Sequence, residues 1–283
     1  AVGQRATLTL TGGEDGSPQP YHGILERVEL VHAWLDETLY RLVLVPELQQ
    51  LTLTQHSEVF VDIDGPTLWK SLLLAGDALP HDYHTLRLSG EYPSRPHVCA
   101  YKESHYRFLA RQLERDGAYF FFEHDSDRGC ETLVITDERA HHRPSRKQPV
   151  RYLPLSAGDH SAAEALDGFA MTTTAQPARF RARDFDYLKP QLEVLAEHPG
   201  AADGRGTMVV HGDGLSTPEE AKRLARIHAE ARLAGRERFV GNGRVFQLRA
   251  GHTFKLEQHP HEKVNQDYLA VVVEHCGNQA AAP

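Results

Sequence analysis

Residues 183–190 read Arg-Asp-Phe-Asp-Tyr-Leu-Lys-Pro, and the alternation of acidic and aromatic residues in this stretch decides how we interpret the chain. A two-residue period is typical of a β-strand whose two faces differ. Asp184 and Asp186 have the spacing of side chains on the same side of one strand. A catalytic pair of carboxylates could have this spacing, but no acid/base or substrate-binding motif accompanies it. We therefore expect both residues to make structural hydrogen bonds.

The first part of the chain has the same strand-like alternation. Residues 7–10, 27–30 and 40–42 alternate polar with apolar residues, which predicts half-buried strands. The acidic turn at Asp36 and Glu37 predicts a hairpin between the second and third of these strands.

A short helix is predicted after this hairpin. Residues 65–66, Gly-Pro, open it, because proline at the first helical position loses no hydrogen bond. Gly76 can end it in a left-handed conformation. The apolar residues of its buried stripe are Leu68, Leu72 and Leu73.

Residues 81–143 read as a compact α+β unit. Ser104 is the expected N-cap of a helix over Tyr106 to Arg115, and Gly117 stops that helix. Two neighbouring strands follow at 118–122 and 132–136, where aromatic and β-branched residues are concentrated. The residues that form one face of the helix are Tyr106, Leu109, Ala110 and Leu113.

The clearest helix signal covers residues 218–234. Thr217 is its N-cap, proline takes the first position, and Glu220 completes a capping box. Gly235 ends the helix. Thr217→Ala is expected to cost about 0.5–2 kcal/mol, whereas Ser161→Ala, in a predicted loop, is expected to cost little.

The residues alone predict a mainly β fold with an α+β insert. Three further strands are predicted near 239–248, 253–258 and 268–275, after a basic, proline-containing linker at 141–149. Long βαβ alternation is missing, which disfavours a doubly wound parallel sheet. Small antiparallel barrels fit the pattern better.

Five segments, in the same order, resemble the VgrG proteins, the trimeric spike of bacterial type VI secretion, which are related to the hub at the tip of contractile phage tails. Residues 183–190 look like the family's Arg-Asp-Tyr-Asp-Tyr/Phe-x-x-Pro segment. Residues 21–25 look like its early Phe-His-Gly-Ile/Val strand, and residues 40–46 like its Tyr-x-Leu-x-Leu-x-Pro. Residues 109–124 are similar to its helix and Glu-Gly-Ile-Tyr-Tyr-Phe-Glu-His strand. Residues 248–260 resemble its Leu-Arg-Pro-Gly-x-x-Phe-x-Leu-x-x-His-Pro.

This resemblance implies two small antiparallel β-barrel domains of the phage tail hub type. They are expected at residues 1–79 and, after the linker, within residues 150–283, with a compact α/β subdomain at 80–149. In the family a first strand region precedes the point where this chain starts. An OB-type barrel with a β-helical needle follows the point where it ends, so we expect a truncated hub region.

The function implied by the resemblance is structural. The full-length protein is expected to form a homotrimer whose two barrels per subunit make a ring of six, which seats on a hexameric Hcp-like tube. Effector cargo is a further implied partner. Assembly in the bacterial cytoplasm would be followed by translocation at the tip of the apparatus, through a target-cell envelope. A contractile-phage hub or baseplate tail protein is the alternative, and a hydrolase or metal-dependent effector is the second alternative.

Composition excludes several other classes of protein. The formal net charge of −8 argues against a nucleic-acid binder, which needs a cationic face. No apolar run approaches the ~20 residues that span a bilayer, so we expect no stable membrane insertion by this fragment. The three cysteines are far apart and odd in number, which predicts reduced thiols rather than a disulfide framework. They are Cys99, Cys130 and Cys276.

We expect no catalytic, cofactor-binding or metal-ligating residue. The chain lacks Gly-x-Ser-x-Gly, and residues 212–217 and 241–243 are interpreted as turns rather than phosphate loops. The histidine clusters lack the helical spacing of a metal site. The histidines of residues 141–142 and 259–261 are interpreted as solvated loop residues, and the remaining cluster is His81 with His84.

Overall fold

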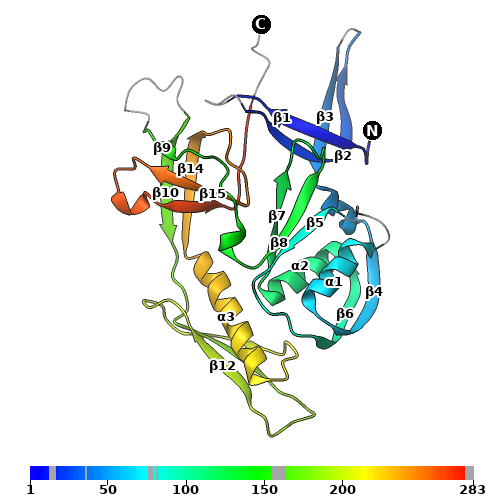
Figure 1. Ribbon diagram of the computed structural model, residues 1–283, viewed down its shortest axis with the longest axis vertical. Coiled ribbons are helices and arrows are strands. Elements are labelled where there is room, and N and C mark those ends of the chain that lie inside the picture. The colour runs from blue at the N-terminus through cyan, green and yellow to red at the C-terminus, as the bar shows by residue number, and fades with distance from the viewer. Residues whose placement is uncertain (13–16, 36, 76–78, 81, 155–163, 278–283) are drawn as a thin grey trace. The chain divides into compact units, whose positions relative to one another are not determined.

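The computed structural model describes residues 1–12, 17–35, 37–75, 79–80, 82–154 and 164–277. The expectations for Asp36, Gly76, His81 and Ser161 fall outside these residues. The fold is mainly β, and the chain divides into two compact units (Figure 1). Unit 1 contains residues 1–111, 119–168 and 242–283, and unit 2 contains residues 112–118 and 169–241. The predicted three-domain division at 79 and 149 stays a prediction.

Unit 1 begins with an antiparallel sheet of β1 (Arg5–Leu10), β2 (Gln19–Ala33) and β3 (Thr38–Val45). The predicted hairpin is confirmed, and the Trp34 N–H donates to the Glu37 carbonyl at 2.7 Å across its turn. Two irregularities interrupt the β2–β3 register, one of them between Leu30 and His32. Such bulges increase strand twist.

Two helices, the second only as far as residue 111, pack in unit 1 against a two-stranded antiparallel ribbon, β4 (Gln55–Ile63) and β6 (Arg95–Ser104). The predicted short helix is α1 (Gly65–Leu73), and its three stripe leucines are all buried. Asp64 caps it by accepting the Thr67 N–H at 2.9 Å. The second helix, α2 (His105–Asp116), begins after Ser104, whose hydroxyl accepts the Arg107 N–H at 3.2 Å, as predicted.

A second sheet of unit 1 contains β5 (His84–Arg87), β8 (Glu131–Thr136) and β7 (Tyr119–His124), in that order. Gly117, with φ +72°, ends α2 as predicted. β7 runs antiparallel to β8, which confirms the predicted neighbours, and β5 runs parallel to β8. Every residue of β8 is buried, so this strand forms the centre of the local core.

The remaining large sheet contains β14 (Glu237–Arg244), β10 (Ala165–Thr173), β9 (Val150–Tyr152), β15 (His252–Glu257) and β16 (Asp267–Ala270). It is mixed, because β9 runs parallel to both β10 and β15. The antiparallel arrangement predicted for residues 150–283 is therefore only partly right, because β15 and β16 are antiparallel whereas β9 is parallel to both of its neighbours. Side-chain alternation is the same for parallel and antiparallel strands, so the sequence pattern does not give the strand direction.

Two local expectations for this region also change. Residues 241–243 lie inside β14 rather than in a turn. A Cβ on Gly243 would stand 2.3 Å from the Ala165 carbonyl oxygen, so glycine is required there for close strand approach. The predicted linker at 141–149 is packed, since Arg146 forms a 2.8 Å ion pair with Glu164 and both side chains are at most 6% exposed.

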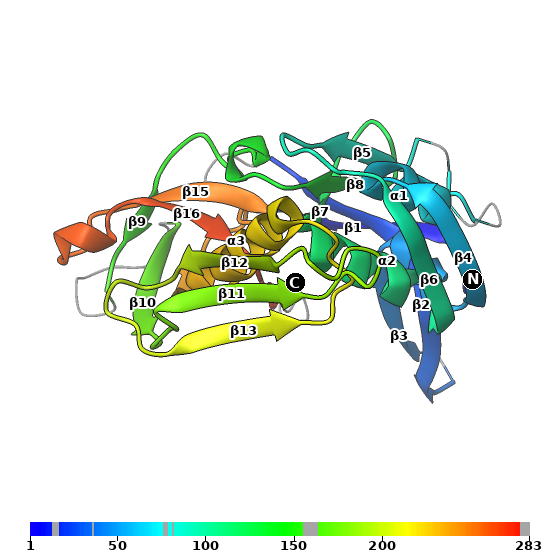
Figure 2. The same cartoon turned by 90° about the horizontal axis from the view of Figure 1, so that it is seen from below.

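Unit 2 contains a three-stranded sheet with helix α3 (Pro218–Ala234) on one face, as Figure 2 shows. The strand order is β12 (Val194–Pro199), β11 (Arg179–Asp184), β13 (Thr207–His211). β11 is antiparallel to β12 and parallel to β13. The predicted helix 218–234 is confirmed. Its buried residues pack on the sheet through a cluster of Ala182, Val194, Leu215, Ala221, Leu224 and Ala225.

Candidate functional site

The stretch at residues 183–190 is a strand end followed by a turn. β11 stops at Asp184, so Asp184 and Asp186 are not neighbours on one strand face, which corrects the expectation. Asp184 accepts the backbone N–H groups of Phe185 at 2.8 Å and Leu215 at 2.9 Å. Asp186 accepts the Leu188 N–H at 2.9 Å. The structural role predicted for both carboxylates is confirmed.

The pKa of Asp184 reflects this role. Partial burial works against the charged carboxylate, but the hydrogen bonds from Leu215 and Phe185 outweigh it and hold the pKa below its usual range. Asp184 therefore acts as a charged anchor for the segment before α3.

Residues 212–217 form the turn that leads into α3, with positive φ at Gly212 and Gly214. Thr217 caps the helix by accepting the Glu220 N–H at 3.2 Å, as predicted. The second half of the capping box differs, because the Glu220 carboxylate accepts the N–H of Ser216 at 2.7 Å. The Glu220 carboxylate therefore binds the N–H of residue 216, whereas the capping-box motif predicts the N–H of Thr217.

The histidines at 141–142 pack against the protein, so their interpretation as solvated loop residues is wrong. His142 donates through Nδ1 to the Gly251 carbonyl at 2.6 Å and accepts the Tyr119 hydroxyl at 2.9 Å. Both ring nitrogens of His142 therefore form hydrogen bonds within the protein. Among the described residues, no group of three or more potential ligands could hold a metal ion. The thiols of Cys99, Cys130 and Cys276 are free.

The segment at 248–256 works as a clamp within unit 1. The Arg249 guanidinium donates to the Gln19 side chain at 2.8 Å and to the Pro20 carbonyl at 3.0 Å. It also lies over the Tyr21 ring, 5.1 Å from the centroid. Arg249 thereby joins the loop before β15 to the start of β2.

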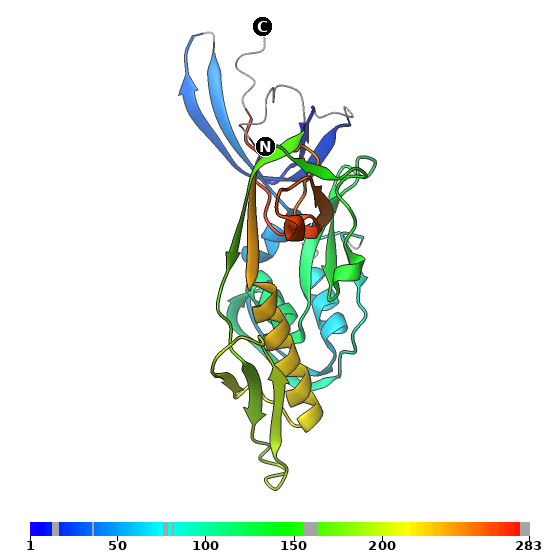
Figure 3. The ribbon, with the colours of Figure 1, turned by 90° about the vertical axis from the view of Figure 1, so that its left-hand side faces the viewer.

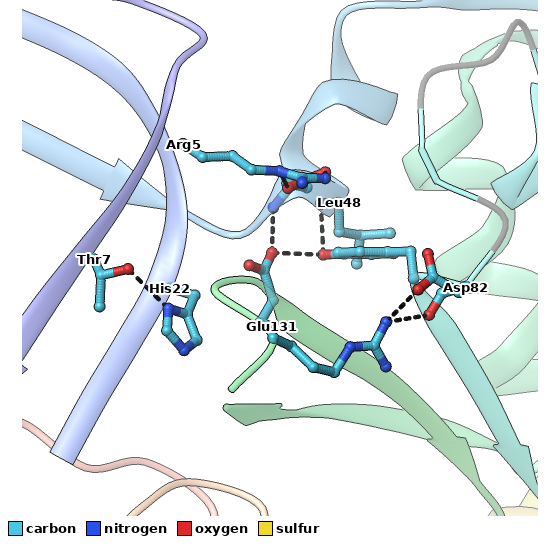
Figure 4. Close-up of polar contacts among 9 residues, drawn as sticks. Arg5, Thr7, His22, Leu48, Asp82 and Glu131 are labelled. Atoms are coloured by element: carbon cyan, nitrogen blue, oxygen red, sulfur yellow. Dashed lines mark hydrogen bonds and ion pairs between the residues drawn. The ribbon is translucent and has the colours of Figure 1, made fainter. Parts of the chain in front are cut away.

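A buried polar network joins β1, the 3-10 helix η1 (Glu47–Thr52) and β8. Glu131 is fully buried, and its Oε1 accepts the Glu47 N–H at 2.6 Å and the Tyr83 hydroxyl at 2.8 Å. The Tyr83 oxygen accepts the Leu48 N–H at 3.0 Å, and Arg5 pairs with Glu47 at 2.6 Å (Figure 4). Burial raises the pKa of the Tyr83 phenol far above its usual range, so it stays a neutral donor. The network therefore holds η1 against β8, and the Glu131 carboxylate at its centre is shielded from solvent.

The hairpin of β2 and β3 carries several exposed apolar residues among those that the structure describes. We call residues Val28–Ala33 and Thr38–Leu42 the β2–β3 arm. Figure 3 shows the arm extending away from the rest of unit 1. Its exposed large apolar side chains, all at least 40% exposed, are Leu30, Val31, Leu39, Tyr40 and Leu42. The sequence predicted half-buried strands here, and the single chain leaves them uncovered.

Four apolar residues of the arm, Val28, Leu30, Tyr40 and Leu42, share one face. Val28 stands opposite Leu42, and Leu30 stands opposite Tyr40. Directly opposed residues share a face. The pair Glu29 and Arg41 lies between them on the other face and forms an ion pair at 3.2 Å. A two-stranded ribbon with an uncovered apolar face is at best marginally stable alone, so this face fits burial in an assembly.

The outer face of the β4–β6 ribbon is a second exposed apolar area of unit 1. The inner face packs on α2, where the Phe60 and Phe108 rings stack at 5.9 Å. Val59, Val61 and Tyr101 remain more than half exposed.

Among the described residues, no helix combines the length and the apolar character needed to cross a bilayer.

Comparison with known proteins identifies relatives of the whole chain. The family model of the phage tail baseplate hub (GPD) matches residues 1–281. The chain is 28% identical, over 280 residues, to the type VI secretion system spike protein VgrG1b of Pseudomonas aeruginosa. That match covers 97% of this chain and 37% of the relative, so the chain spans well under half of the relative's length.

Solved structures agree on the fold. The E. coli c3393 protein is a type VI secretion component with structural similarity to the T4 tail proteins gp27 and gp5. It aligns with a TM-score of 0.67 at 17% identity, over 93% of this chain and 57% of its own. The 43 kDa tail protein of prophage MuSo2 from Shewanella oneidensis aligns with a TM-score of 0.58 at 9% identity, over 94% and 82%. At these identities the likeness concerns the fold alone.

Proposed function

Because the chain belongs to the phage tail baseplate hub (GPD) family, we propose that it is the hub region of a type VI secretion spike. In this proposal the full-length protein forms a homotrimer that caps a hexameric Hcp-like tube and helps to puncture a target-cell envelope. The role is structural rather than enzymatic, with effector cargo as a further partner. The protein would assemble in the bacterial cytoplasm and then be translocated at the tip of the tube.

The β2–β3 arm is the observation that carries this proposal. Closed threefold symmetry needs a heterologous contact that leaves apolar surface open on an isolated subunit. Leu30, Tyr40 and Leu42 offer such a surface, each more than half exposed on one face of the arm. We infer that the sheet of β1–β3 and the mixed five-stranded sheet complete two barrels of the tube, within residues 1–79 and 150–283, with residues 80–149 as the insert.

Sedimentation of the full-length protein that contains this chain tests the trimer. We expect Leu30→Asp/Leu42→Asp to break the trimer into monomers, because two carboxylates would be buried without partners at the interface. Leu188→Asp/Val209→Asp, a control at two exposed apolar positions of unit 2 outside both barrel sheets, should leave the trimer intact. A stable monomer of the unchanged full-length protein would refute the proposal.

Tube docking has its own test. Charge reversals on the tube-facing surfaces should abolish secretion of the Hcp-like protein without unfolding the domain. Secretion that survives deletion of residues 151–283 would contradict a tube-capping role. A contractile-phage hub is the alternative, favoured by the family match. A hydrolase or metal-dependent effector is the second alternative, and no observation favours it.

A further inference from the structure

The face of the unit 2 sheet that α3 leaves open carries three arginines on its middle strand. Figure 2 shows α3 on one face of this sheet. Phe180 and Ala182 of β11 are buried, and Ala182 packs in a cluster with residues of α3. Successive side chains of a strand point to opposite faces, so Arg179, Arg181 and Arg183 share the open face. The whole chain has a formal net charge of −8, which makes this row a local exception.

The middle arginine already binds a carboxylate. Arg181 stands directly opposite Glu197 of β12, and its Nε donates to the Glu197 carboxylate at 2.7 Å, with a second donation from the same guanidinium. Arg179 stands opposite Pro199 and Arg183 opposite Leu195. Neither of these two outer arginines has a carboxylate partner among the described residues. Arg179 and Arg183 carry the same forked guanidinium donor as Arg181. The Arg181–Glu197 pair between them shows that this donor binds a carboxylate on this face.

The row continues into an anchored turn with exposed aromatic residues. Phe185, Tyr187 and Leu188 are 61%, 79% and 74% exposed. The carboxylates of Asp184 and Asp186 fix the backbone of this turn through hydrogen bonds. The side chains are thus displayed from a rigid backbone, which lowers the entropy cost of binding.

We propose that this surface docks an extended acidic segment of a partner protein. We call it the arginine–aromatic surface, and it consists of Arg179, Arg181, Arg183, Phe185, Tyr187, Leu188 and Val209, the last of which lies beside Arg181 on β13 and is 54% exposed. Arginine and tyrosine are the residues that dominate binding energy at protein interfaces. Charge complementarity fixes the chemistry of the occupant, because two unpaired guanidinium groups call for two carboxylates.

The spacing makes the proposal specific. Arg179 and Arg183 are four residues apart, about 13 Å along a strand. In an extended partner the residues at positions i and i+4 have the same separation and the same orientation. The residue at i+2 would face the Arg181–Glu197 pair, so a third acid there would meet the Glu197 carboxylate. The favoured segment therefore has acids at i and i+4 and a neutral residue between them.

Nucleic acid fits this surface less well. Glu197 lies in the middle of the face and would repel a phosphate chain, and high affinity for phosphates needs many cations. A single three-stranded face is also a small interface, and small interfaces bind weakly. We expect micromolar to millimolar affinity that falls as salt screens the charges.

A peptide titration tests the proposal on the chain of residues 1–283. The probe is the peptide Thr-Glu-Thr-Val-Thr-Glu-Thr, followed by amide chemical shifts at low salt, with a Gln-for-Glu peptide as control. We expect shifts confined to β11, β13 and the 185–188 turn. Affinity should fall at least tenfold for Arg179→Glu/Arg183→Glu, and also for the milder Arg179→Gln/Arg183→Gln. A third glutamate in place of the central valine should weaken binding.

Matched controls make the outcome decisive. Lys222→Glu/Arg238→Glu changes the net charge equally at two exposed positions outside the surface, and should bind the peptide as the unchanged chain does. Equal affinity for all variants, or for the Gln peptide, would overturn the proposal. A single-stranded DNA of equal charge that binds more tightly through Arg179 and Arg183 would overturn it in favour of nucleic acid. If the unchanged chain self-associates and the Arg179→Glu/Arg183→Glu variant does not, the proposal would be overturned in favour of a second copy of this chain as the occupant.

Discussion

Gly251 lies directly against Phe121, so that a Cβ at position 251 would stand 2.4 Å from the Phe121 Cβ. Gly251 also has φ +78°, which L side chains rarely adopt. The loop before β15 therefore approaches β7 more closely than any other residue type permits. Close packing against Phe121 therefore explains why position 251 in the 248–256 segment is a glycine.

Gly251→Ala should destabilise the protein by more than the backbone strain alone, because the new methyl group meets a fixed Cβ rather than a flexible side-chain end. Gly129→Ala is the matched control, because Gly129 has φ +63° and a Cβ there would meet no heavy atom within 4 Å. We expect about 1–2 kcal/mol for the control, which carries the strain only, and a larger loss for Gly251→Ala. Urea denaturation measures both values. Equal losses would show that the loop moves to accept the methyl group.

Local signals made the helices predictable from the sequence. Thr217 and Glu220 mark the start of α3 within four residues, and Ser104 and Gly117 bracket α2. Each signal acts on neighbouring backbone groups, so a single sequence contains all of it. The strand pairs joined by short turns, such as β2 with β3, were predictable for the same reason.

Strand direction and distant contacts were not predictable. The parallel pairing of β9 with β15 joins residues about a hundred positions apart, and alternation gives no direction. The spacing of Asp184 and Asp186 predicted a shared strand face, because the partner of Asp184, the N–H of Leu215, lies 31 residues along the sequence and leaves no local signal. The sequence also did not predict that Leu30 and Tyr40 are exposed, for a different reason. Strand alternation looks the same whether the apolar face is covered by the same chain or by a partner.

Thr217→Ala should lower the free energy of unfolding by roughly 0.5–2 kcal/mol, because it leaves the Glu220 N–H without its acceptor. Thr172→Ala, at an exposed strand position, is the control and should cost less. Glu220→Ala should act separately by freeing the Ser216 N–H. Chemical denaturation of the three variants checks this order. Equal midpoints for Thr217→Ala and Thr172→Ala would mean that the cap contributes nothing.

The buried pair of Arg146 and Glu164 should show a large single-site effect. Glu164→Leu leaves a guanidinium buried without its carboxylate and should cost about 3–5 kcal/mol. The double variant Arg146→Met/Glu164→Leu removes both charges and should recover most of that loss. Arg226→Ala, which removes an exposed 3.9 Å pair with Glu230, should cost less than about 1 kcal/mol. A double variant as unstable as Glu164→Leu would show that the ion pair itself, rather than the orphaned charge, matters.

Acidification should destabilise unit 1 through His124. Its Nδ1 accepts the His22 N–H at 3.0 Å. Burial first, and then the nearby Arg249, His22 and His252, together lower the pKa of His124 to about 4. An unfolded chain has a histidine pKa near 6.5, so the unfolded state binds the proton first. Stability is therefore complete above about pH 6.5 and falls as the pH drops toward 4, by at most about 3 kcal/mol.

Urea denaturation at pH 7.0, 5.5 and 4.5 measures this slope. His124→Asn keeps an acceptor near Nδ1 and cannot take up a proton, so its stability should change less between pH 7.0 and 4.5. His32→Asn, on the exposed arm, is the control and should keep the slope of the unchanged chain. The carboxylates whose pKa values are lowered, such as Asp184, lose their contribution only below about pH 4, so they do not obscure the upper part of the range. An unchanged slope in His124→Asn would assign the acid sensitivity to other groups.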